Sequence, residues 1–306
     1  MKLTLVVNPK ASAYTPKRRA AVEEVLAQGY DLAVVETLYR NHAIDLARAA
    51  ADGGADAVVV LGGDGTVSEA ANGLAGTRTA LAALPGGSTN VFARTIGMAR
   101  KVKPAAAQLP AALAKPPRPI GLGLVNGRYF LFHVGMGFDA AVVEKVEQKP
   151  ELKRKIGQAV FVYAAFATWF RRFDRKAPHL AVEQDGTTYV DDGYFAICLN
   201  SNPYTYLGLR RLQVAPDAGL DRPLVLVTLR TIRFGKFLPL VGATLGSGRK
   251  LQTSSWVDYR PELKEVTVAA APGRAGIPYQ ADGDYLGEAG RLTFSWEPER
   301  LLLVTP

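Results

Sequence analysis

Short apolar runs alternate with amphipathic segments over the first third of the chain. The apolar runs predict buried strands at residues 3–7, 31–36, 58–61 and 79–84. The segments between them predict helices, of which the first begins at Thr15 as N-cap with Pro16 in its first turn, and the second at Asn41 as N-cap. Two more helices are expected over 91–97 and 105–114. Because strands that alternate with helices form parallel sheets, this part of the chain is predicted to be a parallel α/β domain.

The pattern changes after a proline-rich junction at residues 115–119. Two hairpin turns are predicted beyond it, at Asn126-Gly127 and at Asp185-Gly186, and one helix over 151–172. Further strand-like runs cover 194–199, 224–229, 264–270 and 291–296. The expected organisation is therefore an α/β domain at 1–117, an antiparallel β-sandwich domain at 118–298, and a C-terminal segment at 299–306 that can pack back on the first domain.

Composition narrows the class of protein. With 48% hydrophobic and 21% charged residues, the 306-residue chain has the balance of a folded soluble protein. Its 37 basic and 28 acidic residues give a formal net charge of +9, which favours anionic partners such as nucleotides or acidic lipids. No nucleic-acid-binding module is recognisable, so a nucleic-acid partner is not expected. The composition leaves the oligomeric state open.

The expected location is the cytoplasm. Cys198 is the single cysteine, which excludes an intrachain disulfide and suits a reducing compartment. The chain begins as a strand and not as a signal peptide, and no apolar run reaches the roughly 18 residues of a membrane-spanning helix.

Candidate chemistry lies directly after the third predicted strand. Gly62, Gly63 and Gly65 lack the Cβ atoms that would keep a ligand away from the backbone, and Thr66 at the helix start can donate to a phosphate oxygen. The N–H groups of such a turn and of the following helix favour an anion. Asp64 would repel a bare phosphate, so the predicted ligand is a nucleoside triphosphate that brings a metal ion or a sugar hydroxyl. A tight turn with Asp64 as a cap is the alternative.

Further motifs accompany this turn in a fixed order. They are Val7-Asn8-Pro9-Lys10, Leu84-Pro85-Gly86-Gly87-Ser88-Thr89-Asn90-Val91-Phe92-Ala93-Arg94 and Ala281-Asp282-Gly283-Asp284. In that order and spacing, together with Gly62–Thr66, they resemble the diacylglycerol kinase catalytic-domain family, which includes bacterial soluble lipid kinases and the sphingosine and ceramide kinases. The resemblance implies an N-terminal nucleotide domain, a C-terminal lipid-substrate domain, and a cleft between them where ATP phosphorylates a lipid hydroxyl with Mg²⁺ as cofactor.

The resemblance also suggests which residues bind the nucleotide. Asn8 and Lys10 end the first strand at the same sheet edge as the glycine turn, and Lys10 can neutralise phosphate charge. Thr37, Ser88 and Asn90 match nucleotide-contact positions of the family. For each of these residues an ordinary turn or solvated loop position is the alternative.

Carboxylates provide the metal-binding and proton-transfer groups. Asp64 is the expected Mg²⁺-linked acid, because Mg²⁺ prefers oxygen ligands and needs only one or two carboxylates. Asp282 is the candidate general base, and Asp284 can support a metal through water. Asp284 stands where the family usually has Glu. The alternative for this pair is an Asp-Gly hairpin turn with both carboxylates in solvent.

Two departures from the family leave other functions open. Val91 occupies a position where many members have an Asp of the metal network, and Arg222 stands where bacterial members have a ligand of a structural metal, so we expect that site to be absent. A small-molecule kinase of the NAD-kinase type shares the Gly62–Thr66 turn, although the stretch over 86–94 argues against it. A non-catalytic lipid- or nucleotide-binding protein on a kinase scaffold is the third possibility.

Two basic-apolar stretches suggest contact with a membrane surface. Residues 156–170 are apolar and flanked by basic clusters, and residues 230–237 combine basic and aromatic side chains. The alternatives are a buried helix for the first stretch and a solvated face for the second. A peripheral, salt-sensitive association with anionic lipid headgroups is expected.

Overall fold

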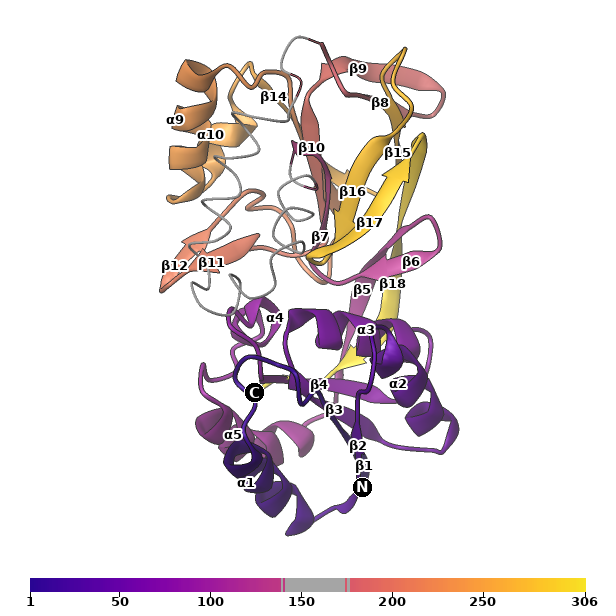
Figure 1. Cartoon of the computed structure of the whole chain (residues 1–306), viewed down its shortest axis with the longest axis vertical. Helices are drawn as coiled ribbons and strands as arrows, with labels where there is room; N and C mark the ends of the chain where they lie inside the picture. Colours follow the sequence, from indigo (N-terminus) through magenta and orange to yellow (C-terminus); the bar gives the residue numbers. More distant parts are fainter. Residues whose placement is uncertain (139, 141–173, 175–176) are drawn as a thin grey trace. The chain divides into compact units, whose positions relative to one another are not determined.

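The structure is a computed structural model that describes residues 1–138, 140, 174 and 177–306. It divides into two compact units (Figure 1): unit 1 comprises Met1–Leu122 and Pro298–Pro306, and unit 2 comprises Gly123–Glu297. The predicted fold class is confirmed, with a parallel α/β unit followed by an antiparallel β unit. The helix predicted over 151–172, the apolar stretch 156–170 and their flanking basic residues lie outside the described residues.

Unit 1 is a parallel sheet covered by helices. Its strands follow the order β2-β1-β3-β4, and the end of β18 adds to β4 with Leu303 opposite Leu81. Helix α1 packs with α5 and α2 with α3, and Figure 1 shows these pairs on opposite faces of the sheet. The elements are β1 (Lys2–Val7), α1 (Pro16–Ala27), β2 (Asp31–Glu36), α2 (His42–Asp52), β3 (Ala57–Gly62), α3 (Asp64–Leu74), β4 (Ala80–Pro85), α4 (Val91–Thr95) and α5 (Val102–Leu113).

Helix starts in unit 1 show where local sequence preference holds and where it fails. The Thr15 side chain accepts from Arg18 N at 3.2 Å, so this predicted N-cap is confirmed. Asn41 is the N-cap residue of α2, as predicted, but its side chain makes no capping hydrogen bond. Glu69 of α3 caps α2 instead: its carboxylate accepts from Asn41 N at 2.9 Å and from Ala43 N at 3.2 Å. A carboxylate at that position also complements the helix dipole.

Unit 2 is a sandwich of two antiparallel sheets. One sheet has the order β14-β13-β10-β7-β16-β17, and the other contains β18-β15-β8-β9 with β5 and β6 beside β18. Their facing apolar side chains form the core between the sheets, which includes Phe130, Val134, Cys198, Val268 and Phe294. The strands are β5 (Arg118–Val125), β6 (Arg128–Phe130), β7 (His133–Gly137), β8 (Leu180–Gln184), β9 (Thr187–Gly193), β10 (Phe195–Leu199), β11 (Thr205–Leu207), β12 (Arg210–Leu212), β13 (Leu224–Leu229), β14 (Val257–Leu263), β15 (Glu265–Ala270), β16 (Ile277–Ala281), β17 (Asp284–Ala289) and β18 (Arg291–Leu303).

Two helices of unit 2 correct the sequence-based expectation of a single helix over 151–172. They are α9 (Phe234–Thr244) and α10 (Arg249–Gln252). Leu240 and Leu251 from these helices join a second apolar cluster with Ile197, Val225 and Val227 of the six-stranded sheet. The helices thus cover the outer face of that sheet. Among the described residues, no helix has both the length and the apolar character that a membrane span needs.

Candidate active site

Two glycine turns follow β3 and β4, and their backbones pack against each other. Gly86 N donates to Gly62 O at 2.8 Å, and a Cβ atom on Gly86 would lie 2.7 Å from Gly62 N. A Cβ atom on Gly87 would lie 2.7 Å from the Cα atom of Gly63. At Gly62, a Cβ atom would meet Thr66 Cβ at 2.6 Å. Contacts this short are forbidden, so packing alone accounts for the glycines at these three positions.

Gly63 has a different environment. A Cβ atom there would meet Gly87 Cα at 3.5 Å, which is an ordinary contact, and its φ of −84° suits any residue. Neither packing nor backbone conformation therefore requires glycine at this position. Gly63 is also the N-cap of α3, whose start carries no side-chain cap from the described residues. The first N–H groups of a helix lack intrahelical partners and favour anions, so the backbone here is suited to a phosphate.

The ends of the first three strands bring most of the predicted nucleotide-binding residues together. Asn8 Nδ2 donates to Thr66 Oγ1 at 2.9 Å, and Asn8 Oδ1 accepts from Lys10 N at 2.9 Å. Thr37 is buried, and its N–H donates to Val7 O at 2.9 Å. Lys10 is exposed, with its Nζ atom 3.4 Å from Leu38 O. Asn8 thus joins the first strand to the glycine turn at the carboxyl edge, where open α/β sheets bind ligands.

The second turn is shaped by Asn90. Its Oδ1 atom accepts from Gly87 N at 2.7 Å, and its Nδ2 atom donates to Gly87 O at 2.8 Å. The residue is buried and adopts a left-handed φ of +52°, which asparagine tolerates well. Ser88, at the tip of the same turn, is exposed. Asn90 therefore holds the turn in shape, and Ser88 presents a hydroxyl group at its surface.

Asp64 connects the first turn to helix α4. Its Oδ1 atom accepts from Phe92 N at 3.0 Å, so the carboxylate caps a helix that begins 27 positions later at Val91. Desolvation raises the pKa of Asp64 above its ordinary value, while N–H groups of Val91, Phe92 and Asn90 and the charge of Arg94 oppose that shift. The cap anticipated as an alternative does exist, although it serves the helix of the neighbouring turn. Val91 is buried in the first turn of α4.

In unit 2, Asp282 lies in a tight hairpin turn and is buried. Asp282 and Gly283 connect β16 to β17 with φ angles of +52° and +90°, as a two-residue hairpin requires. Only 8% of Asp282 is exposed. Its Oδ2 atom accepts from Leu131 N at 2.8 Å, and Oδ1 accepts from Phe132 N at 2.8 Å and His133 N at 3.2 Å. The hairpin turn named as the alternative is present, but the carboxylate of Asp282 is anchored within the protein and does not lie in solvent.

Two further carboxylates, of which Asp284 was named from the sequence, have separate partners. Asp284 Oδ2 lies 3.4 Å from Arg128 Nη2, and both side chains are partly buried. Asp217 Oδ2 accepts from Gln252 Nε2 at 2.6 Å and from the Tyr259 hydroxyl at 2.9 Å, which links its loop to α10 and β14. No cluster of three or more His, Cys, Asp or Glu side chains is arranged for a metal in the described part of the chain. A metal at Asp64 would take further oxygen ligands from other sources, such as water or a bound phosphate.

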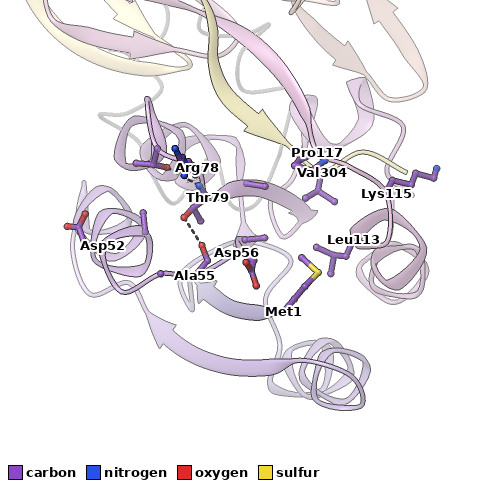
Figure 2. A pocket seen from close by; sticks show the side chains of 15 residues that line it. Met1, Asp52, Ala55, Asp56, Arg78, Thr79, Leu113, Lys115, Pro117 and Val304 are labelled. Carbon is purple, nitrogen blue, oxygen red and sulfur yellow. Dashed lines mark hydrogen bonds between the residues drawn. The ribbon is translucent and has the colours of Figure 1, made fainter.

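A cavity of about 510 Å³ lies elsewhere in unit 1 (Figure 2). Met1, Asp56, Arg78 and Lys115 line it, and Thr79 Oγ1 at its wall donates to Ala55 O at 2.7 Å. These residues flank the amino ends of β1, β3 and β4, and none of them belongs to the predicted nucleotide-binding set. Since open α/β sheets bind ligands at the opposite, carboxyl ends, the cavity does not bear on the candidate site.

Several site groups were not predicted from the sequence. The N–H groups of Leu131, Phe132 and His133 hold Asp282, and Arg128 pairs with Asp284. Backbone donors leave no signal in side-chain chemistry, and Arg128 belongs to no motif. Arg94, whose charge acts on Asp64, does lie in the motif that continues from the second glycine turn.

Comparison with known proteins assigns the chain to a family. Residues 2–124 match the diacylglycerol kinase catalytic domain. A probable lipid kinase YegS-like of Pseudomonas syringae pv. syringae is 33% identical over 303 residues, covering 90% of this chain and 92% of the relative. The chain belongs to the diacylglycerol kinase catalytic-domain family. The resemblance noted from the motifs is thereby confirmed, and the family match itself covers the N-terminal stretch of unit 1.

Other relatives match over shorter regions. A probable lipid kinase YegS-like of Chromohalobacter salexigens is 37% identical over 161 residues, and a diacylglycerol kinase of Bacillus subtilis is 33% identical over 162 residues. These matches cover 51% of this chain and about half of each relative, 50% and 52%. The fold is shared with a putative diacylglycerol kinase from Bacillus anthracis, at a TM-score of 0.77 and 22% identity, covering 100% of this chain and 96% of that one.

Proposed function

We propose that the protein transfers the γ-phosphoryl group of ATP, with Mg²⁺ as cofactor, to the hydroxyl group of a lipid. The observation that carries the proposal is the open backbone at Gly63, at the start of α3, in a member of the diacylglycerol kinase family. A glycine that neither packing nor conformation demands lets a phosphate approach the backbone, and the helix N-terminus favours its charge. A lipid is the proposed acceptor because relatives are named lipid kinase and diacylglycerol kinase.

On the nucleotide side, unit 1 supplies the phosphate cradle. Gly63, Gly65 and the start of α3 bind phosphate oxygens, while Gly62 keeps the two turns in contact. The Thr66 hydroxyl, oriented by Asn8, donates to the same group. Lys10 contributes positive charge from the exposed end of the first strand. The remaining contacts are assigned to Thr37, Ser88 and Asn90, of which Asn90 acts mainly by shaping its turn.

Asp64 is the residue proposed to hold Mg²⁺. A cation would compensate the desolvation that raises the pKa of this carboxylate, so the residue fits a metal-linked role. Mg²⁺ keeps several waters and is commonly held by one or two carboxylates with substrate phosphates. When bound there, the metal neutralises negative charge on the phosphoryl group that is transferred.

On the acceptor side, Asp282 is proposed as the general base and Asp284 as its supporting acid. The hydroxyl oxygen of the lipid forms a bond to the γ-phosphorus as the bond to ADP breaks, and Asp282 accepts the hydroxyl proton. The N–H groups of Leu131, Phe132 and His133 fix the orientation of this carboxylate. The lipid-substrate domain at 118–298 is thus proposed to place the hydroxyl, and the protein would act at a membrane surface with anionic headgroups.

Transfer of label from ATP tests this function directly. The purified protein is incubated with γ-labelled ATP and Mg²⁺, in one arm with mixed lipid vesicles and in another with NAD. We expect label in the lipid extract. Label in NAD would identify an NAD-kinase-type enzyme. Absence of label from every acceptor, in protein that still binds ATP, would point to a binding protein on a kinase scaffold.

Asp64→Asn is expected to lower activity on the order of 100-fold or more, because a group that stabilises transition-state charge is lost. The amide oxygen can still accept from Phe92 N, so the capping hydrogen bond to α4 can be kept, and thermal unfolding establishes that the variant is folded. The folded-state pKa of Asp64 is raised, so the wild type loses stability as pH rises from the unfolded value of about 4 towards the folded value. Asp64→Asn has no carboxylate to ionise at this position, so it does not lose this stability. The difference between its thermal midpoint and that of the wild type should therefore rise between pH 4 and pH 7.

Activity assays with Mg²⁺ measure the first effect. Thermal unfolding in EDTA, where no metal is bound, measures the second. Asp31→Asn, which removes an exposed acid of the same unit, serves as the charge-matched control and should change neither. Full Mg²⁺-dependent activity in Asp64→Asn would refute the metal role.

A further inference from the structure

Helix α9 of unit 2 exposes an apolar face. Leu238, Val241 and Leu245 follow each other at intervals of three and four residues, which places them on one side of the helix. They are 50%, 37% and 42% exposed. Leu240 on the other side is buried in the cluster that covers the six-stranded sheet. The helix is therefore anchored by one face and presents aliphatic side chains to solvent with the other.

The β11–β12 hairpin presents a second exposed apolar group. Leu209 in its turn is 74% exposed, and Leu207 is 36% exposed. Arg210 and Arg211 follow directly and are also exposed. Tyr206, the middle residue of β11, is buried. The hairpin thus carries leucine at its tip with two cations beside it.

Hydrogen bonds join this hairpin to the end of α9. Gln213, the residue after β12, donates from its backbone N–H to Thr244 O at 2.7 Å and from Nε2 to Gly246 O at 3.1 Å. Figure 1 draws α9, α10 and the hairpin on the same flank of unit 2. We call the exposed side of α9, the start of α10 and the hairpin the docking surface. The hydrogen bonds of Gln213 hold the hairpin and the end of α9 together.

A long stretch of the chain that contributes to the docking surface carries only positive charges. Residues 223–257 contain five cations and no Asp or Glu. Arg233, Arg249 and Lys250 are exposed. Lys236 lies over the ring of Trp256, 3.1 Å from its centroid, and that tryptophan is 40% exposed. Of these five, Arg230 pairs with Asp192 at 2.7 Å, which leaves four cations for the docking surface.

We propose that the docking surface binds an anionic lipid bilayer. Aliphatic side chains that project from a helix and a hairpin, with arginine, lysine and tryptophan around them, match the interfacial zone of a membrane, where apolar groups insert and cations meet headgroup phosphates. The choice of a lipid surface rests on the proposed function, but binding itself requires no catalysis. The surface lies outside every residue assigned above to the nucleotide or to proton transfer.

Vesicle sedimentation without ATP tests the docking surface. Wild type is compared on phosphatidylglycerol and phosphatidylcholine vesicles with Leu209→Ser, with Leu238→Ser/Leu245→Ser, and with Arg249→Gln/Lys250→Gln. Tyr189→Ser in β9 is the control for loss of apolar surface, because the Tyr189 side chain is 47% exposed. Arg100→Gln/Lys101→Gln in unit 1 removes the same charge elsewhere. Thermal unfolding establishes that each variant is folded.

Wild type should bind the anionic vesicles at low salt and release them as salt is raised. Each cation removed should weaken binding about fivefold, and each leucine variant at least tenfold, whereas both control variants should bind as wild type does. Leu209→Ser changes a turn and keeps the test decisive even if the α9 double variant does not fold. Equal binding to both vesicle types, equal losses in the controls, or a change in oligomeric state without a change in vesicle binding would overturn the proposal.

A water-soluble short-chain lipid separates this proposal from the proposed function. The docking variants should phosphorylate the dispersed lipid as wild type does and lose activity only on vesicles. Failure of wild type to label any lipid while it still binds anionic vesicles would remove the proposed function and leave the docking surface standing.

Discussion

Asp282→Ala is expected to destabilise unit 2 by about 3 kcal/mol or more, because each buried donor left without a partner costs about 1–3 kcal/mol. Three such donors, the N–H groups of Leu131, Phe132 and His133, would lose the carboxylate that accepts from them. The left-handed φ of +52° adds a cost of about 1 kcal/mol for alanine, which tolerates that region less well than aspartate. Denaturant unfolding measures the loss.

This structural role affects how any activity loss at Asp282 is interpreted. Loss of a general base lowers turnover by about 100- to 10,000-fold, and unfolding of unit 2 would mimic it. Asp282→Asn is the more informative variant. It keeps one oxygen and tolerates the turn, but its amide group must face one of the three N–H donors, so a loss of about 1–3 kcal/mol is expected. Its turnover must be measured where unfolding curves show it to be native.

Asp284→Asn provides the matched control for stability, since it removes one carboxylate two residues away. Asp284 contacts Arg128 at 3.4 Å and both side chains are partly exposed, so its loss should cost less than about 1 kcal/mol. A folded Asp282→Asn protein with turnover near that of wild type would exclude the general-base role and leave Asp282 as a structural residue alone.

A structural feature could be predicted from the sequence when the residues that determine it lie close together in the chain. The parallel pairing of β1 to β4 and the hairpins at Asn126-Gly127 and Asp185-Gly186 follow from apolar runs and turn residues, and the structure confirms them. Helix α9 was not predicted, because it contains Gly235, Pro239 and Gly242, which oppose helix formation in isolation. Packing of its inner face on the six-stranded sheet outweighs that preference.

The site shows the same division between local and distant partners. Asparagine is a residue type that favours the N-cap position, as at Asn41, yet the carboxylate of Glu69 from another helix accepts the capping hydrogen bonds. Asp64 is part of a local motif, but the N–H group that its carboxylate accepts from is at the start of α4, which follows the next glycine turn. The donors to Asp282 lie about 150 residues earlier in the chain. Such pairings become visible only when strands and turns are placed in space.

The glycine turns allow packing and ligand binding to be separated by mutation. Gly86→Ala is expected to destabilise unit 1 by about 1–3 kcal/mol, the usual cost of overpacking, because its Cβ atom would lie 2.7–2.8 Å from backbone atoms of Gly62. Those atoms belong to the backbone and cannot rotate away. The two turns must move apart, so nucleotide affinity should fall together with stability. Thermal unfolding and ATP titration of the same protein measure both.

Gly63→Ala should separate the two effects. Its Cβ atom would meet Gly87 Cα at an ordinary 3.5 Å, and its φ of −84° suits alanine, so stability should remain within about 0.5 kcal/mol of wild type. If a phosphate approaches the backbone at this position, the added methyl group obstructs it, and ATP affinity should fall tenfold or more, about 1.4 kcal/mol. Gly29→Ala, where a Cβ atom meets nothing within 4 Å, is the control and should leave both quantities unchanged. A stable Gly63→Ala protein that binds ATP as tightly as wild type would show that the phosphates do not lie against this turn, whereas a selective loss of affinity separates the ligand-facing glycine from its packing neighbours.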